Sequence, residues 1–369
     1  MSLPSIRTQI FLIVLCMLSI TGCESIQYYG QAIHGQVSIL NKRRPIDRLL
    51  ADPETPEKLK EKLRLVLQIR DFADNELHLP VNGNYLSYVE IKRPAVVWNV
   101  FAAPEFSLTP KTWCFPIVGC TAYRGYFSEK KAQAYAEKQK KIGLDVFIGP
   151  VLAYSTLGWF DDPILSTVIN RSESGLAALI FHELAHQILY VDDDTAFNES
   201  FATTVEQEGL RRFMSATHKD QAFSDYLGSY QRQLAFRALV MNYRNKLDIL
   251  YNKHISLDEK RSQKALIIEA LRKEYQHQKL LWQGYAGYDR WFKAPINNAK
   301  MNTVSTYHEL GPAFQNFLQY YEGNLTQFYK ACQKLAKKSK VARLRELKMK
   351  PTGKTARADR RNAQKKGAK

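Results

Sequence analysis

Two histidines four residues apart stand in the stretch LIFHELAHQILYVDDDTAFNESFATTVE, residues 179–206. Its segment HELAH, residues 182–186, matches the pattern HExxH. Residues i and i+4 of an α-helix lie on one face, about 6 Å apart along the axis, so the rings of His182 and His186 can reach one metal ion. The surrounding residues are apolar on nearly every side of the helix, and burying two imidazoles and a carboxylate there costs free energy unless they have partners. The stretch therefore predicts a metal site on a buried helix.

A catalytic zinc ion takes three protein ligands and leaves one position open to water. Glu183 directly follows the first histidine, so it can act as general base on that water and pass the proton to a leaving amine. We expect Glu199, at the start of the next helix, to be the third ligand. Glu206, two turns further along the same helix face, and His308 are the alternatives.

The segment NESFA around Glu199 resembles the NExxA signature of the gluzincin metallopeptidases. In that group a glutamate on the following helix completes a His₂Glu site, which here implies Zn²⁺ held by His182, His186 and Glu199. Only 12 residues separate His186 from Glu199, fewer than in the thermolysin-like and neutral aminopeptidase families, so the turn between the helices must be tight. Asp194 or Asn198 can form a hydrogen bond with a ligand histidine, at the ring nitrogen that does not bind the ion.

A wider set of segments resembles the bacterial lipoprotein family described as putative aminopeptidases. The segments are HELAH with its continuation, TWCFPIVGC, YRGYF, and the downstream NNAKM, TY and PAF, and the likeness covers residues 20–345. It implies zinc-dependent hydrolysis of peptide substrates. The sequence contains no GxMEN segment, which neutral aminopeptidases use beside the substrate amine, so cleavage of terminal or internal bonds stays open.

Peptide hydrolysis also needs a group that stabilises the tetrahedral oxyanion. Tyr307 is our candidate for this catalytic role, with His308 beside it, because related zinc peptidases supply a tyrosine or histidine from a later segment. Asn297 and Asn298 could hold an extended peptide backbone.

The N-terminus predicts a targeting signal over residues 1–22. Arg7 precedes the apolar run IFLIVLCMLSI, residues 10–20, which is too short to span a bilayer. The run ends in SITGC, residues 19–23, which resembles the lipobox of bacterial lipoproteins and implies lipidation of Cys23. Glu24 follows, not the aspartate linked to inner-membrane retention. We therefore expect an outer-membrane lipoprotein that faces the periplasm, with an ordinary secretory signal as the alternative.

An oxidising compartment favours a disulfide between Cys114 and Cys120, which bracket the short loop CFPIVGC. Cys332 is left over, and we expect it to be buried.

The net charge of +17 is concentrated at the C-terminus. Residues 334–369 hold 15 Lys and Arg against 2 acids, a local charge of +13, which leaves 17 − 13 = +4 for the rest. This segment contains no aromatic residue that could stack on bases. We expect a basic, disordered tail over residues 336–369, and no nucleic-acid partner.

Helical spacing and strand-like segments together predict a mostly helical α+β fold. Short β-branched and aromatic segments at 85–91, 95–103, 123–127 and 145–155 indicate a small antiparallel sheet, with a helix over 128–143. Further helices are expected over 173–191, 198–217, 220–252 and 257–285. We expect one domain, residues 23–335, in which the sheet packs on the HExxH helix pair and the long helices.

The composition, 45% hydrophobic and 12% aromatic, is typical of a globular protein. We expect a membrane-anchored zinc metallopeptidase. The alternatives are a lipid-anchored envelope scaffold whose metal site is structural or vestigial, and a basic-tailed adaptor for anionic surfaces.

Overall fold

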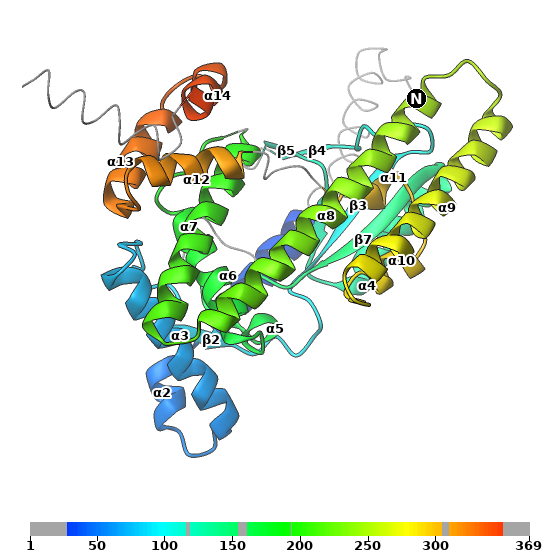
Figure 1. Ribbon diagram of the computed structural model, residues 1–369. Helices are drawn as coiled ribbons and strands as arrows, with labels where there is room; N and C mark the ends of the chain where they lie inside the picture. Colours follow the sequence, from blue (N-terminus) through cyan, green and yellow to red (C-terminus); the bar gives the residue numbers. More distant parts are fainter. Residues whose placement is uncertain (1–27, 116–118, 154–160, 193, 305–309, 350–369) are drawn as a thin grey trace, which may run out of the picture.

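The computed structural model describes residues 28–115, 119–153, 161–192, 194–304 and 310–349. They form a mostly helical α+β protein with three small sheets (Figure 1). The predicted fold class is confirmed. Residues 1–27, with Cys23 and the signal segment, lie outside the described residues, as do Tyr307 and His308.

The first part of the chain supplies helices and one mixed sheet. A helix over residues 28–41 leads to β1 (Arg44–Pro45), α2 (Ile46–Ala51) and α3 (Glu57–Asn75). β2 (Ser87–Val89) pairs antiparallel with β1 and parallel with β8 (Ile164–Leu165), which α5 (Ser166–Ile169) follows. These strands and α3 contribute to the largest hydrophobic core, which also contains the helix with the HExxH motif.

The antiparallel sheet has the strand order β6–β3–β7. Its strands are β3 (Val97–Pro104), β6 (Arg124–Tyr126) and β7 (Leu144–Val151), with Trp98 opposite both Tyr126 and Pro150. Between β6 and β7 lies α4 (Glu129–Lys141), which begins at the predicted cap, since Ser128 Oγ accepts a hydrogen bond from Lys131 N. Two short strands, β4 (Trp113–Phe115) and β5 (Gly119–Thr121), form a separate ribbon.

Most of the antiparallel sheet packs in a core of its own. Trp98 and Val100 of β3 share this core with Tyr135 of α4, whereas Val97 at the start of β3 packs against the core that contains the HExxH helix pair. The mixed sheet β1–β2–β8 also belongs to the core of the helix pair, through the fully buried Val89 and the nearly buried Ile164 and Leu165 of its strands.

Helices α6 (Glu173–Ala185) and α7 (Thr195–Ala216) are the predicted HExxH pair, and they pack closely on each other. Gly209 in the middle of α7 allows this approach. A Cβ atom there would lie 2.7 Å from Leu77 Cδ1 and 3.0 Å from Phe181 Cδ2. Phe181 directly precedes His182, so this contact helps to set how near the end of α6 comes to α7.

Two long helices follow, α8 (Asp220–Tyr251) and α9 (Leu257–Leu281). The first turns of α8 contribute Phe223 and Tyr226 to the core around α6 and α7, whereas Phe236 and later residues pack with α9 in another core. Figure 1 shows α8 running as one straight helix from the region of α6 to that of α9. α8 therefore connects two separately packed parts of the molecule.

The remaining helices are short. They are α10 (Asp289–Lys293), α11 (Asn298–Met301), α12 (Gly311–Tyr320), α13 (Leu325–Ala336) and α14 (Lys340–Met349). α14 corrects the predicted tail, because residues 340–349 are helical and Arg343 is buried against Asp194. The rest of the predicted tail, residues 350–369, lies outside the described residues.

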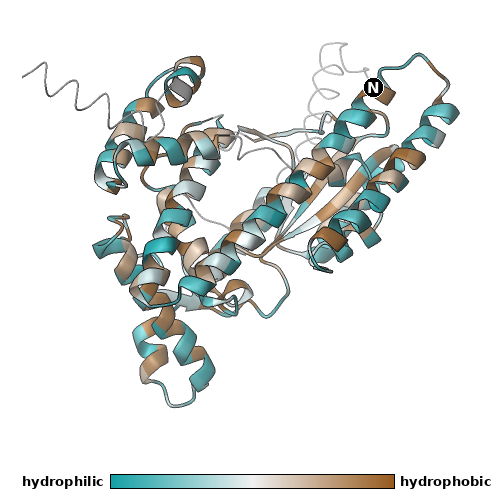
Figure 2. Cartoon of the chain, in the orientation of Figure 1, coloured by the Kyte–Doolittle hydropathy of each residue, from teal (hydrophilic) through white to brown (hydrophobic). Residues whose placement is uncertain are grey.

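Hydrophilic and hydrophobic residues alternate along the helices (Figure 2). Within the described residues, none of the helices has the length and apolar character that a membrane span requires.

Candidate metal centre

Helix α6 carries His182 and Glu183 in its last turn, with His186 at its C-cap. Ser172 starts the helix by accepting a hydrogen bond at Oγ from Gly175 N over 3.1 Å. Apolar residues on several sides of α6 are fully buried, including Leu176, Ile180 and Leu184. The three polar side chains therefore lie in a mainly apolar environment, as the sequence indicated.

The side chains of Asp194 and Asn198 stabilise the tight turn between the two helices. Asp194 caps α7 by accepting a hydrogen bond from Phe197 N, and the Asn198 side chain bonds both Val191 N (2.9 Å) and Val191 O (2.8 Å). The suggestion that Asp194 or Asn198 bonds a ligand histidine was therefore wrong. Both residues instead fix the backbone from which Glu199 projects.

The side chains of His182, His186 and Glu199 come together as a group that could hold a metal ion. His182 Nε2 lies 3.3 Å from both His186 Nε2 and Glu199 Oε2, and His186 Nε2 lies 3.6 Å from Glu199 Oε1. Two ligand atoms that each bind a tetrahedral zinc ion at about 2.0–2.1 Å are about 3.3–3.4 Å apart. The two ring nitrogens and the Glu199 carboxylate, with one oxygen near each ring, are therefore spaced as a zinc ion requires.

Glu206 occupies a different position from the one proposed for a third ligand. Its Oε2 lies 2.8 Å from His182 Nδ1, the ring nitrogen that faces away from the other two donors. The hydroxyl of Tyr226 on α8 donates a hydrogen bond to Glu206 Oε1 over 2.6 Å. A carboxylate behind a ligand histidine fixes the tautomer and the orientation of the ring. Glu206 therefore supports His182 and does not complete the group.

The two histidines have opposite charge preferences. Burial disfavours a charge on His182, but hydrogen bonds to Glu199 and Glu206 outweigh it and raise its pKa to about 10. Burial and the positive charge of His182 lower the pKa of His186 to about 4. His186 Nδ1 is buried and has no hydrogen-bond partner in the structure. In the metal-free protein, His182 is thus the protonated ring and His186 the neutral one.

The Glu183 carboxylate lies at the edge of this group. Burial raises its pKa, the charge of His182 lowers it, and the charge of Glu199 raises it again. Among the described residues it has no hydrogen bond or ion pair that would hold it. A desolvated, unpaired carboxylate beside a metal position is suited to exchange a proton with a substrate or a water molecule.

Other expected site residues have different outcomes. Cys114 and Cys120 form the predicted disulfide, which joins β4 to β5, and Cys332 is buried as predicted. Asn297 and Asn298 do not face a substrate. Asn297 caps α11 and bonds Val146 O, while the buried Asn298 side chain bonds the carbonyl oxygens of Pro104, Glu105 and Ser107.

Sequence reasoning missed Tyr226, because no motif surrounds it and its role depends on how α8 crosses α7. The available signal was weak: Tyr226 falls in the first two turns of a helix that directly follows the helix with both glutamates.

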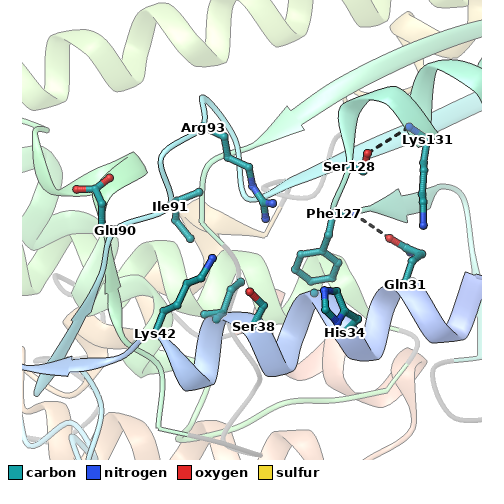
Figure 3. A pocket seen from close by; sticks show the side chains of 12 residues that line it. Gln31, His34, Ser38, Lys42, Glu90, Ile91, Arg93, Phe127, Ser128 and Lys131 are labelled. Carbon is teal, nitrogen blue, oxygen red and sulfur yellow. Dashed lines mark hydrogen bonds between the residues drawn. The ribbon is translucent and has the colours of Figure 1, made fainter.

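A pocket away from the metal group is lined by several basic side chains (Figure 3). It is a cavity of about 160 Å³ between the helix over 28–41 and the start of α4, and it contains His34, Lys42, Arg93 and Lys131. The Arg93 guanidinium already donates hydrogen bonds to Ala95 O and Val96 O. Within the described residues, the only group of three possible metal ligands is the one on α6 and α7.

A family model described as "Putative aminopeptidase" matches residues 27–347 of the chain. The chain belongs to this family. The match includes the helix pair α6–α7 and every other described strand and helix except the end of α14. No curated protein and no solved structure matches the chain significantly. Family membership supports a peptidase-like hydrolase.

Proposed function

We propose that this protein is a zinc-dependent metallopeptidase that hydrolyses peptide bonds. His182, His186 and Glu199 hold the ion, and Glu183 is the general base. The observation that carries this proposal is the spacing of the two ring nitrogens and the Glu199 carboxylate oxygens, 3.3 to 3.6 Å, which fits tetrahedral zinc. The family description, which names aminopeptidase activity, agrees with it.

A bound zinc ion would polarise the scissile carbonyl and make a water molecule acidic enough to ionise near neutral pH. The protein residues supply the remaining steps. Glu206, held by the Tyr226 hydroxyl, fixes the His182 ring so that Nε2 faces the ion. Glu183 accepts the proton of the attacking water and transfers it to the leaving amine. Burial raises the pKa of its carboxyl group, which favours proton uptake.

A catalytic role fits this group better than the scaffold alternative. Structural zinc sites are usually closed by four protein ligands, whereas three ligands leave one position open. The group contains three, and the nearby Glu206 contacts the ring nitrogen of His182 that faces away.

The proposed location is the cell envelope, with a lipid anchor on Cys23. This rests on the sequence SITGC, residues 19–23, after an apolar segment.

The test compares the purified protein with its Glu183→Gln variant. Zinc content is measured by elemental analysis, and a mixed peptide library is digested and its products sequenced. We expect about one zinc ion per chain in both proteins and loss of cleavage in the variant by at least about 100-fold. Zinc bound without cleavage of any library member by the parent protein would favour the scaffold.

The sequenced products also decide between removal of single N-terminal residues and cleavage at internal bonds.

A further inference from the structure

Arg237 of α8 has a buried donor atom without a hydrogen-bond partner among the described residues. This atom, Nη1, is inaccessible to solvent. Burial lowers the pKa of this guanidinium, while the negative charge of Glu199 and the hydroxyls of Tyr230 and Tyr288 raise it. A buried donor without a partner costs about 1–3 kcal/mol, and more when it is charged. An acceptor from outside the chain would remove this cost.

The helix geometry places Arg237 on the side of α8 that faces the metal group. Tyr226 contacts Glu206 directly, and Arg237 follows it by eleven residues, which is close to three full turns and so the same face. On α7, Glu199 precedes Glu206 by two turns. Glu199 is among the groups that raise the pKa of Arg237, so the two side chains lie within electrostatic range of each other.

Glu199 itself does not satisfy Arg237. Among the described residues no ion pair joins the two, and the Glu199 oxygens face the two histidines instead. Once Glu199 and the rings hold a divalent cation, the region around Arg237 carries still more positive charge. The site then favours an anionic ligand beside the metal position.

We propose that Arg237 binds the free α-carboxylate of a short peptide whose scissile bond lies at the metal group. This inference rests on the proposed peptidase function. A guanidinium binds a carboxylate through two parallel hydrogen bonds, a geometry that a lone peptide carbonyl cannot match. Tyr230 and Tyr288 lie near enough to Arg237 to influence its pKa, and Tyr288 stacks on Phe236 with ring centroids 4.3 Å apart.

The experiment uses pairs of short peptides that differ only at the C-terminus, one with a free carboxylate and one with an amide. For the zinc-loaded parent protein we expect kcat/KM to be about 10- to 100-fold higher for the free acid, the range of one charge-assisted contact. Arg237→Gln should lower the value for the acid to that for the amide, mainly through KM, and leave amide cleavage and zinc content unchanged.

Two further variants control for a purely structural effect. Arg237→Lys keeps the positive charge but loses the planar group that makes two parallel hydrogen bonds. Part of the preference for the free acid should therefore remain. Arg211→Gln removes an arginine on α7 that is half exposed and pairs with Glu208, and it should keep the full preference.

Equal cleavage of acid and amide by the parent protein would overturn the inference and leave the proposed function intact. A loss of kcat in Arg237→Gln that is equal for both peptides would also overturn it, and would place Arg237 at the scissile carbonyl. If the parent cleaves neither peptide, the proposed function fails. Binding of the acid and the amide to zinc-loaded protein then decides: an Arg237-dependent preference for the acid upholds the carboxylate site, and equal binding removes it.

Discussion

The His182 imidazole is contacted at both ring nitrogens, and these contacts fix the orientation of the ring. Nε2 faces His186 and Glu199, while Nδ1 faces Glu206, which in turn accepts a hydrogen bond from the Tyr226 hydroxyl. The ring therefore stands in one orientation before any ion binds. Preorganisation of this kind raises metal affinity, because less conformational freedom is lost on binding.

Replacing Glu206 tests this arrangement. In Glu206→Gln the carboxylate behind His182 is lost, and we expect zinc affinity to fall about 10- to 100-fold. Tyr226→Phe removes only the hydroxyl and should have a smaller effect in the same direction. Competition with a chelator of known affinity measures both. If Glu206→Gln abolished zinc binding as completely as Glu199→Gln, Glu206 would be a ligand, and the assignment made here would be wrong.

The pKa values of the two rings predict how metal binding depends on pH. With its pKa raised to about 10, His182 is protonated in the metal-free protein at neutral pH, whereas His186, at about 4, is neutral. A zinc ion binds neutral imidazole, so about one proton must leave His182 on binding. Affinity should rise about tenfold per pH unit between pH 7 and 9 and level off near pH 10.

Calorimetry in buffers of different ionisation enthalpy counts the released protons. No release at pH 7.5 would contradict the protonated state assigned to His182.

At the scale of elements, the contact between α14 and the start of α7 is the main unexpected feature. Arg343 Nη2 lies 2.7 Å from Asp194 Oδ2, and both side chains are almost fully buried. Asp194 also caps α7, the helix that carries Glu199. The basic C-terminal segment thus contributes an ion pair to the turn that positions a proposed metal ligand.

Arg343→Met should lower the free energy of unfolding by about 3 kcal/mol, because it leaves Asp194 buried without its main partner. Lys340, at 3.8 Å from Asp194, can replace only part of the interaction. Urea denaturation measures the change, with the exposed Arg345→Met as control. A double variant with Asp194→Asn should lose less than the sum of the single variants. A change under about 0.5 kcal/mol in Arg343→Met would show that the pair contributes little.

At the scale of the whole molecule, α8 joins the core around the metal group to the core around α9. Tyr226 near one end contacts the metal-supporting Glu206, and Arg237 lies near the middle. A single rigid helix therefore carries both the residue that supports a ligand and the proposed carboxylate-binding residue. Their relative position is fixed by the helix backbone, not by a loop.

The proposed anchor is also a property of the whole molecule. Cys23→Ala should move the protein from the membrane fraction to the soluble fraction of lysed bacteria, because the attached acyl chains would be lost. Fractionation followed by immunodetection measures this, and Ser19→Ala is the control. Equal membrane association of the two variants would contradict a lipid anchor at Cys23.

The sequence by itself determined the helices and the two histidines of the site. The predicted helices agree with α4, α6, α7, α8 and α9, with ends displaced by a few residues at most sites. These features depend on local interactions, namely apolar spacing along a helix, caps such as Ser128, and the i, i+4 relation of His182 and His186. Sequence patterns predict such features because the interacting residues lie within one helical turn of each other.

Only the tertiary structure decided which acid faces the rings. Glu199 and Glu206 lie two turns apart on one face of α7, so helix periodicity alone cannot separate them. The close packing of α6 on α7 at Gly209 brings Glu199 to the Nε2 atoms and leaves Glu206 at Nδ1. The packing of the antiparallel sheet, the helical α14 and the position of Arg237 depend in the same way on contacts between distant segments. Such contacts are set by the packing of whole side-chain surfaces, which no local pattern encodes.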